Sequence, residues 1–240
     1  GAVVTLKAEE DASERPVVVM GEGHIRFFGS GGALTVDNIV AQGDGQNYFI
    51  TFDPSFTDAS HIKIYDSKIM DFPRAAIRED GPESGAKIDS LMIENSEFYN
   101  FDDDGYRFVH FGSIIGFDYF KIANTTVSDF SESFLWSETP TTKTIVLKNL
   151  TIEGLVVPKP RFIGLTSAGG SFTMENCIMT NFETNDATIF GLTGFTNTTM
   201  KNSRYFNVGS VEYGWSTVEN FEEADPGFAD PDNYDFSLPE

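Results

Sequence analysis

The sequence has little of what usually cross-links a small protein or fixes it in a membrane. It has one cysteine, Cys177, so it forms no internal disulfide, and we expect this residue to be a small buried side chain rather than a nucleophile. No apolar run approaches the roughly 20 residues that a membrane-spanning helix needs, and no secretion-signal pattern is present. We therefore expect no direct insertion into a membrane.

Basic residues are scarce as well. The chain has 16 Lys and Arg against 37 Asp and Glu, which gives a formal net charge of −21. So acidic a chain repels phosphate-rich surfaces, and we expect neither a nucleic acid nor an anionic membrane as a partner. A polyanionic ligand is equally unfavourable unless calcium or a local basic patch offsets the repulsion.

Long helical patterns are missing too, and one six-residue pattern takes their place. The pattern is apolar-x-[Asn/Asp]-x-x-apolar, and its polar anchors fall at positions 38, 66, 95, 124, 149, 176 and 202, in steps of 25 to 29 residues. A fixed period of this length is the signature of a solenoid. Apolar and polar residues alternate around the anchors, as in Phe120-Lys121-Ile122, and this is the spacing of strands.

Each period holds two or three short strands and no segment long enough for a crossover helix. A leucine-rich repeat needs a Leu-rich consensus, and a propeller blade needs about 40 residues, so neither fits. We predict an all-β, single-domain parallel β-helix of about seven coils over residues 1–240. We expect the cap and first turns over 1–33, the repeating coils over 34–216 and an end segment over 217–240.

The recurring asparagine has a physical reason. It ends a strand and begins a bend, where Asn tolerates left-handed backbone angles, and its amide can bond to the equivalent residues one coil above and below. We expect this ladder inside the rod, which would make the glycosylation triplets at Asn124 and Asn149 inaccessible. The alternative is that the anchors are surface turn residues.

Several segments resemble one group of proteins. They are Val4-Thr5-Leu6-Lys7-Ala8-Glu9 with Pro16-Val17-Val18-Val19, the coil Ile93-Glu94-Asn95-Ser96-Glu97-Phe98-Tyr99-Asn100-Phe101, and the tail from Asp225 to Leu238, where Asn233-Tyr234-Asp235 replaces the usual Asn-Gly-Asp. Together they resemble the right-handed parallel β-helix proteins of the pectate-lyase-like superfamily, and in particular uncharacterised surface proteins of glycan-degrading Bacteroidetes.

The resemblance extends over essentially the whole chain and implies a right-handed coil. It also implies a place outside the cell or on the outer cell surface, with any lipid anchor carried by a segment outside this sequence. Function follows from it less directly, because this fold hosts lyases, hydrolases, esterases, adhesins and plain binding modules.

Hydrolysis of the polygalacturonase type needs acid and base carboxylates that flank one glycosidic bond. Such enzymes carry Asn-x-Asp, Asp-Asp, Gly-His and Arg-x-Lys segments at coil-related spacing. Here Asp102-Asp103 and Gly23-His24 lie far apart in the chain, and the sequence has no Arg-x-Lys. We expect no hydrolysis by that route.

A polysaccharide lyase remains an alternative. It needs a base to remove the proton next to a uronic carboxylate and a cation to hold the developing charge. Arg107 or Arg161 would be the base, and the calcium candidates are Asp102, Asp103 and Asp104. Three adjacent carboxylates are more typical of a solvated turn, because neighbouring side chains cannot all converge on one ion.

The strands after the variable turn carry aromatic and basic residues. Taking Val109, Ile163 and Phe190 as inward residues puts His110 in an outward column, with Arg78 and Trp136 beside it on neighbouring coils. A further column holds Phe108, Phe134, Phe162 and Ile189, with Arg107 and Arg161 just before it. With this assignment of inward and outward residues, an exposed strip of aromatic and basic side chains runs along one face. If the assignment is shifted by one residue, the same side chains point inward.

Such a strip suits a carbohydrate, because flat rings stack on sugars and planar donors bind hydroxyls or carboxylates. We predict a noncatalytic, monomeric polysaccharide-binding β-helix of a bacterial surface glycan-utilisation system that needs no cofactor. Its candidate contacts are Arg78, Tyr106, Arg107, His110, Trp136 and Arg161, with Trp136 foremost. The calcium-dependent lyase and a structural adhesin or spacer rod are the alternatives.

Overall fold

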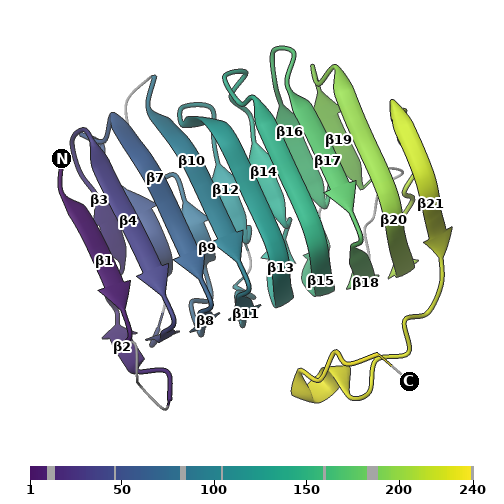
Figure 1. Cartoon of the computed structure of the whole chain (residues 1–240), viewed down its shortest axis with the longest axis horizontal. Coiled ribbons are helices and arrows are strands. Elements are labelled where there is room, and N and C mark those ends of the chain that lie inside the picture. The colour runs from purple at the N-terminus through teal and green to yellow at the C-terminus, as the bar shows by residue number, and fades with distance from the viewer. Residues whose placement is uncertain are drawn as a thin grey trace.

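Parallel strands stacked in about seven turns form the body of the molecule (Figure 1). The computed structural model describes residues 1–9, 14–45, 47–81, 85–103, 105–158, 161–182 and 189–238, with the backbone alone at 155–158 and 182. The prediction of an all-β parallel solenoid is confirmed. No helix within these ranges has the length and apolar character that crossing a membrane requires.

Each turn contributes strands to up to three faces. The first face holds β1 (Val3–Lys7), β4 (Gly32–Asp37), β7 (Asp58–Tyr65), β10 (Lys87–Glu94), β13 (Gly116–Glu132), β15 (Thr144–Pro158), β17 (Ser171–Glu175), β20 (Asn197–Val208) and β21 (Thr217–Glu223). The second face holds β2 (Val17–Gly21), β5 (Val40–Gly43), β8 (Lys68–Met70), β11 (Glu97–Tyr99), β18 (Ile178–Phe182) and the later parts of β13, β15 and β20. Because β13, β15 and β20 continue around the bend, these two faces form one 14-stranded sheet.

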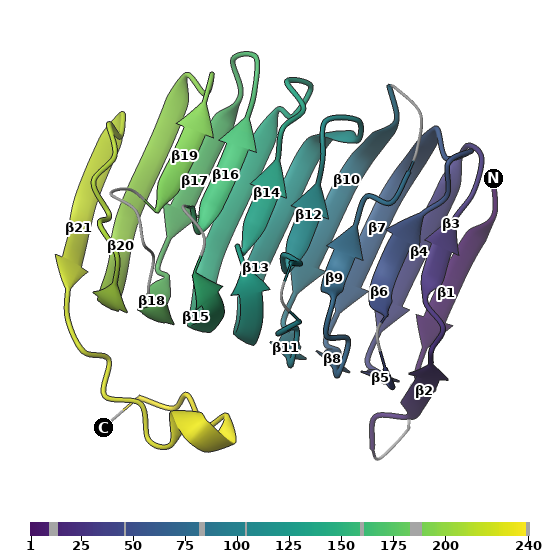
Figure 2. The ribbon, with the colours of Figure 1, turned by 180° about the vertical axis from the view of Figure 1, so that it is seen from behind.

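The third face is a separate 7-stranded sheet, seen from its own side in Figure 2. Its members are β3 (Ile25–Phe27), β6 (Tyr48–Phe52), β9 (Ala75–Arg78), β12 (Val109–Phe111), β14 (Leu135–Ser137), β16 (Ile163–Thr166) and β19 (Phe190–Thr193).

The six-residue pattern sets the register. Its first apolar positions pair from coil to coil in one fully buried column: Val36, Ile64, Ile93, Ile122, Leu147, Met174 and Met200. Phenylalanine rings fill the space between the faces, and Phe134 stacks on both Phe108 and Phe162 at centroid distances of 5.4 Å. Burying a side chain of this size stabilises a fold by about 1.5–3 kcal/mol, so the stacked rings hold successive coils together.

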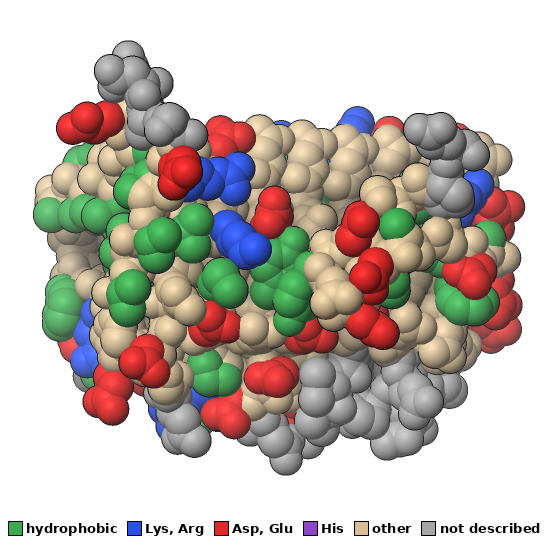
Figure 3. Space-filling model, turned by 90° about the horizontal axis from the view of Figure 1, so that it is seen from below, with side chains coloured by type: hydrophobic (Ala, Val, Ile, Leu, Met, Phe, Trp, Pro, Cys, Tyr) green, Lys and Arg blue, Asp and Glu red, His purple; other side chains and the backbone are tan. Residues whose placement is uncertain are grey.

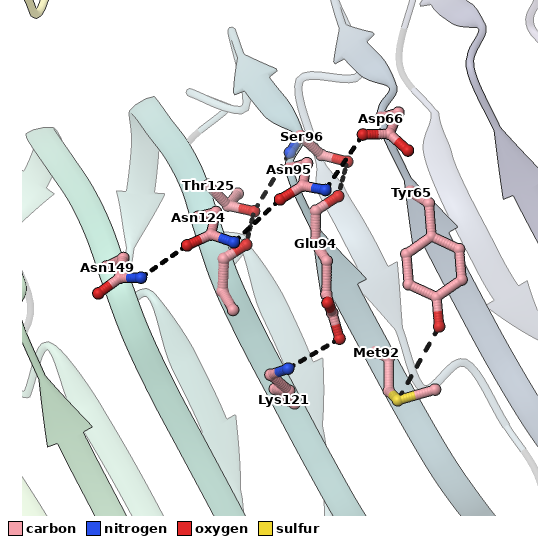
Figure 4. Close-up of polar contacts among 11 residues, drawn as sticks. Tyr65, Asp66, Met92, Glu94, Asn95, Ser96, Lys121, Asn124, Thr125 and Asn149 are labelled. Carbon is pink, nitrogen blue, oxygen red and sulfur yellow. Dashed lines mark hydrogen bonds and ion pairs between the residues drawn. The ribbon is translucent and has the colours of Figure 1, made fainter.

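The polar anchors of the pattern form a ladder at the bend between the first and second faces (Figure 4). Asn95 Nδ2 donates to Asp66 Oδ1 at 3.1 Å, Asn124 Nδ2 donates to Asn95 Oδ1 at 2.9 Å, and the chain of bonds continues to Asn149. Asn124 has a φ of 49°, in the left-handed region, where Asn is tolerated better than most residues.

The ladder side chains are exposed, so the expectation that they lie inside the rod is wrong, as is the inference that Asn124 and Asn149 are inaccessible. The left-handed turn points the anchor outward and the following residue inward. Those following residues form the buried column, which includes Ser67, Ser96, Thr125, Cys177 and Ser203. Burial raises the pKa of the Cys177 thiol to about 12, in agreement with its predicted place as a small core residue.

A second ladder, which sequence reasoning missed, follows the next bend. Gln42 and Asn100 both donate to Asp71, at 2.8 and 2.7 Å, and further along the rod Asn207 donates to Asn181 at 3.0 Å. Asp129 occupies the equivalent bend one coil after Asn100, also with a positive φ of 51°. A carboxylate has no amide to donate, so the ladder is interrupted there.

The C-terminal segment leaves β21 and turns beneath the stack (Figures 1 and 2). It contains one 3-10 helix, η1 (Pro231–Asn233), whose last turn ends at Tyr234 with a φ of 61°. The Tyr234 ring packs on Tyr99 at a centroid distance of 4.5 Å. The end segment is thereby joined to coils near the middle of the rod.

Candidate functional site

The register of the third face brings the predicted outward column together. Arg78 on β9 pairs with His110 on β12, and His110 pairs with Trp136 on β14, so the three lie side by side on consecutive coils. The column continues through Gly164 on β16 and Gly191 on β19. All three side chains are half-buried, while Val109, Ile163 and Phe190 point inward as expected.

His110 lies between two arginines. Arg78 Nη1 is 2.9 Å from Nδ1 of the imidazole, and Arg107 Nη1 is 3.0 Å from Nε2. Burial, together with the positive charges of Arg107 and Arg78, lowers the pKa of His110 to about 3. The imidazole is therefore neutral at physiological pH.

Arg107 is held in place from two further directions. Its guanidinium lies over the ring of Trp136, 4.5 Å from the centroid, and its Nη2 is 3.6 Å from a carboxylate oxygen of the buried Glu132. Burial lowers the pKa of Arg107, and the charge of Arg78 adds to that effect. Stacking on the indole and pairing with Glu132 both favour the charged guanidinium.

Trp136, the foremost candidate contact, is half-buried and held by several neighbours. Its Nε1 donates to Glu138 at 3.2 Å, Arg107 covers its ring, and its benzene edge packs against the backbone of Gly164. A Cβ at Gly164 would fall 2.4 Å from Cε3 and Cζ3 of the indole. The glycine is thus required by the tryptophan beside it rather than by a turn.

Tyr106 belongs to a second layer of planar groups on the same face. Its ring lies 5.8 Å from that of Tyr48, and the guanidinium groups of Arg74 and Arg78 lie 5.3 and 5.0 Å from its centroid. Tyr48 and Arg74 were missed from the sequence. Both occupy the strand and turn segments that the repeat marks, but spacing alone does not distinguish them from neighbouring residues.

The expected column of Phe108, Phe134, Phe162 and Ile189 does not contribute to the surface, because all four side chains are fully buried. Each stands at a bend just before its strand, so the alternation within the strand does not extend to it. Arg161 follows at the far end of the face. It is exposed, and its guanidinium lies over Gly191, where a Cβ would fall 2.6 Å from its Cδ.

The calcium candidates lie elsewhere. Asp102 lines a groove with Asp71 and Asn100, Asp103 follows it, and Asp104 lies outside the described residues. Within the described part of the chain, no three His, Cys, Asp or Glu side chains are grouped so as to hold a metal ion. Calcium binding by Asp102, Asp103 and Asp104 stays a prediction.

Acidic side chains are spread over much of the molecule seen from below, whereas basic ones gather at a few places (Figure 3). Five of the seven arginines of the chain lie on the strands of the third face or directly before them, and four of these are Arg74, Arg78, Arg107 and Arg161; the fifth is Arg26 on β3. We call the group Tyr48, Arg74, Arg78, Tyr106, Arg107, His110, Trp136 and Arg161 the arginine-aromatic strip. It brings four arginines together on one face of an acidic chain.

Comparison with known proteins adds no family to this description. No family model matches the chain, and a search of curated proteins finds no match. The likeness to the pectate-lyase-like superfamily and to Bacteroidetes surface proteins therefore stays a prediction from the sequence. Architecture alone classifies the chain, as a parallel β-solenoid of about seven turns.

Proposed function

We propose that the protein is a noncatalytic polysaccharide-binding solenoid whose binding surface is the arginine-aromatic strip. The observation that supports this most directly is the concentration of planar side chains on one face, with Arg107 stacked on Trp136 and Arg78 beside Tyr106. Flat rings bind the apolar faces of sugars, and guanidinium groups donate to their hydroxyls and acidic substituents.

The shape of the face supports the same proposal. Its strands are parallel and in register, so equivalent side chains repeat about every 4.8 Å along the rod. A polymer lying along the rod meets a new coil at each step and gains from several weak contacts at once. The proposed setting is the outside of a bacterial cell, where the solenoid would hold a polysaccharide for other proteins that degrade it.

Isothermal titration against a panel of plant and host polysaccharides tests the proposal. We expect at least one polysaccharide to bind, and Trp136→Ala to weaken that binding by about tenfold or more, as truncation of a central aromatic contact does. Phe28→Ala is the matched control, because Phe28 is an aromatic residue that is 64% exposed and lies outside the strip. Absence of binding throughout the panel, or equal losses in both variants, would exclude the strip as a binding surface.

A polysaccharide lyase is the second candidate, and the lowered pKa of Arg107 is the observation that favours it. Against it, Glu132 and Trp136 stabilise the charged form of that guanidinium, and a base must be neutral to take a proton. Incubation with polyuronate and calcium separates the two functions, because a lyase produces an unsaturated, ultraviolet-absorbing end group. A sustained rise in absorbance that Arg107→Lys abolishes would establish the lyase.

A further inference from the structure

The contacts of His110 leave one hydrogen bond in the strip unmade. A neutral imidazole has one N–H donor and one acceptor nitrogen. Guanidinium groups donate only, and here one faces each ring nitrogen, at 2.9 and 3.0 Å. Only one of the two arginines can therefore donate to His110. At the other ring nitrogen, two N–H donors face each other without an acceptor.

The surrounding groups do not supply that acceptor. Arg78 contacts the rings of Tyr48 and Tyr106, and none of the described carboxylates forms an ion pair with it. The Nε atoms of Arg78 and Arg107 are buried and have no hydrogen-bond partner in the described structure. Buried donors are nearly always satisfied in folded proteins. These two Nε atoms and the facing N–H groups at His110 are donors without an acceptor, although Glu132 pairs with another nitrogen of Arg107.

We propose that this place binds an anionic substituent of the polysaccharide, a carboxylate or a sulfate ester, between Arg78, Arg107 and the N–H of His110. The proposal rests on the function proposed above and names its ligand class. One oxygen of such a group would accept from the guanidinium and the imidazole N–H together, so the two facing donors would share an acceptor. Charge-assisted bonds of this kind are about twice as strong as neutral ones.

The arrangement also explains how an acidic chain would select such a ligand. The net charge of −21 repels a polyanion at long range, but charges separated by more than about 8 Å are largely screened at physiological ionic strength. Direct contacts with half-buried arginines are screened much less. Recognition would therefore depend on these residues rather than on the overall field.

Matched pairs of polysaccharides test the proposal. One pair is oligogalacturonate and its methyl ester, which separates carboxylate from neutral sugar, and the other is dextran sulfate and dextran, which does the same for sulfate. We expect the charged member of at least one pair to bind about tenfold or more tightly, because a hydrogen bond to a charged group is stronger than one between neutral groups. Arg78→Gln and Arg107→Gln should each remove that preference.

Arg204→Gln is the control, because Arg204 is an exposed arginine on the second face, paired with Glu222 at 3.1 Å, and its loss changes the net charge by the same amount. If Arg204→Gln weakens binding as much as Arg78→Gln does, the loss comes from the change in net charge rather than from a direct contact, and the proposal is overturned. Equal binding of both members of each pair overturns it as well, yet leaves the proposed function standing. Binding of no polysaccharide at all overturns both.

A measurement on the unaltered protein covers the case in which a variant fails to fold. The chain has three histidines, so the imidazole resonances of His110 can be assigned and followed by NMR. We expect them to shift on titration with the charged oligosaccharide and to stay unchanged with its neutral partner. Charged oligosaccharide that binds without shifting them contradicts the proposal.

Discussion

The hydroxyl of Tyr234 donates a 2.7 Å hydrogen bond to Oδ1 of Asn100, 134 residues earlier in the chain. Asn100 belongs to the second ladder, and the next bend holds Asp129, which has no amide to donate. The oxygen that a ladder asparagine would have bonded is thus bonded by the end segment. The end segment therefore docks where the ladder is interrupted, because Tyr234 donates to the Asn100 oxygen that no ladder amide reaches.

Replacing Tyr234 by Phe removes this hydrogen bond and keeps the ring packed on Tyr99. We expect the docking of the end segment to weaken by about 0.5–1.5 kcal/mol, the net value of a typical hydrogen bond. Hydrogen exchange of residues 225–238 measures this, with faster exchange in the variant. Tyr234→Ala should accelerate exchange further, and equal rates in Tyr234→Phe and the parent protein would show that the ring alone holds the segment.

Substitutions at Asn124 separate the two parts of its role, which are a left-handed backbone and the ladder bonds. Asn124→Ala should destabilise the protein by about 1–2 kcal/mol from backbone strain alone, because alanine is disfavoured at a φ of 49°. Asn124→Gly loses the same ladder bonds but tolerates that angle, so it should cost less. Urea unfolding compares them, and a glycine variant no more stable than the alanine variant would contradict the backbone argument.

A methyl group at Gly164 should displace Trp136, since its Cβ would fall 2.4 Å from the indole. We expect Gly164→Ala to shift the tryptophan emission and to weaken polysaccharide binding about as much as Trp136→Ala does. Gly214→Ala is the control for the binding measurement, because a Cβ there meets nothing within 4 Å outside its chain neighbours Tyr213 and Trp215. Unchanged emission in Gly164→Ala would show that the indole is not held against this glycine.

The pKa of His110 gives stability a defined pH dependence. Its folded-state pKa of about 3 lies below the ordinary 6.5, so the unfolded state binds the proton more readily. Stability is therefore lost as the pH falls from about 6.5 towards 3. Burial raises the pKa values of Glu79, Asp129 and Glu153, which acts in the opposite direction as the pH falls.

The variant His110→Gln isolates the histidine from these carboxyl groups, because it keeps a hydrogen-bonding side chain that does not titrate. We expect its urea midpoint to fall less between pH 6.5 and pH 4 than that of the parent protein. Parallel curves for the two proteins would mean that His110 is not held neutral in the folded state.

Periodicity predicted those features that depend on spacing within a strand. The column from Val36 to Met200 and the neighbours Arg78, His110 and Trp136 follow once the strands are in register, because a strand has a period of two. The same period did not predict the direction of the Phe108 side chain, because Phe108 lies in a bend before its strand, where the chain changes direction. Sequence spacing carries no information about which way a corner residue points.

Contacts between distant segments could not be read from the sequence either. Neither the docking of Tyr234 on Asn100 nor the layering of Arg74 with Tyr106 follows from the repeat. The exposure of the first ladder was missed for a further reason, since an asparagine that bonds to its neighbours serves equally well in a core and at a surface.

The tie between Tyr234 and Asn100 also has a mechanical consequence. In a solenoid each coil contacts mainly its neighbours, so tension applied at one end peels off the terminal coil first. Here a pull on the C-terminal end reaches Tyr234 before it reaches β21, and the load passes to Asn100 near the middle of the rod. The last coils carry the load only after that contact breaks. We therefore expect the contact between Tyr234 and Asn100 to protect the last coils from unfolding under a pull on the C-terminal end.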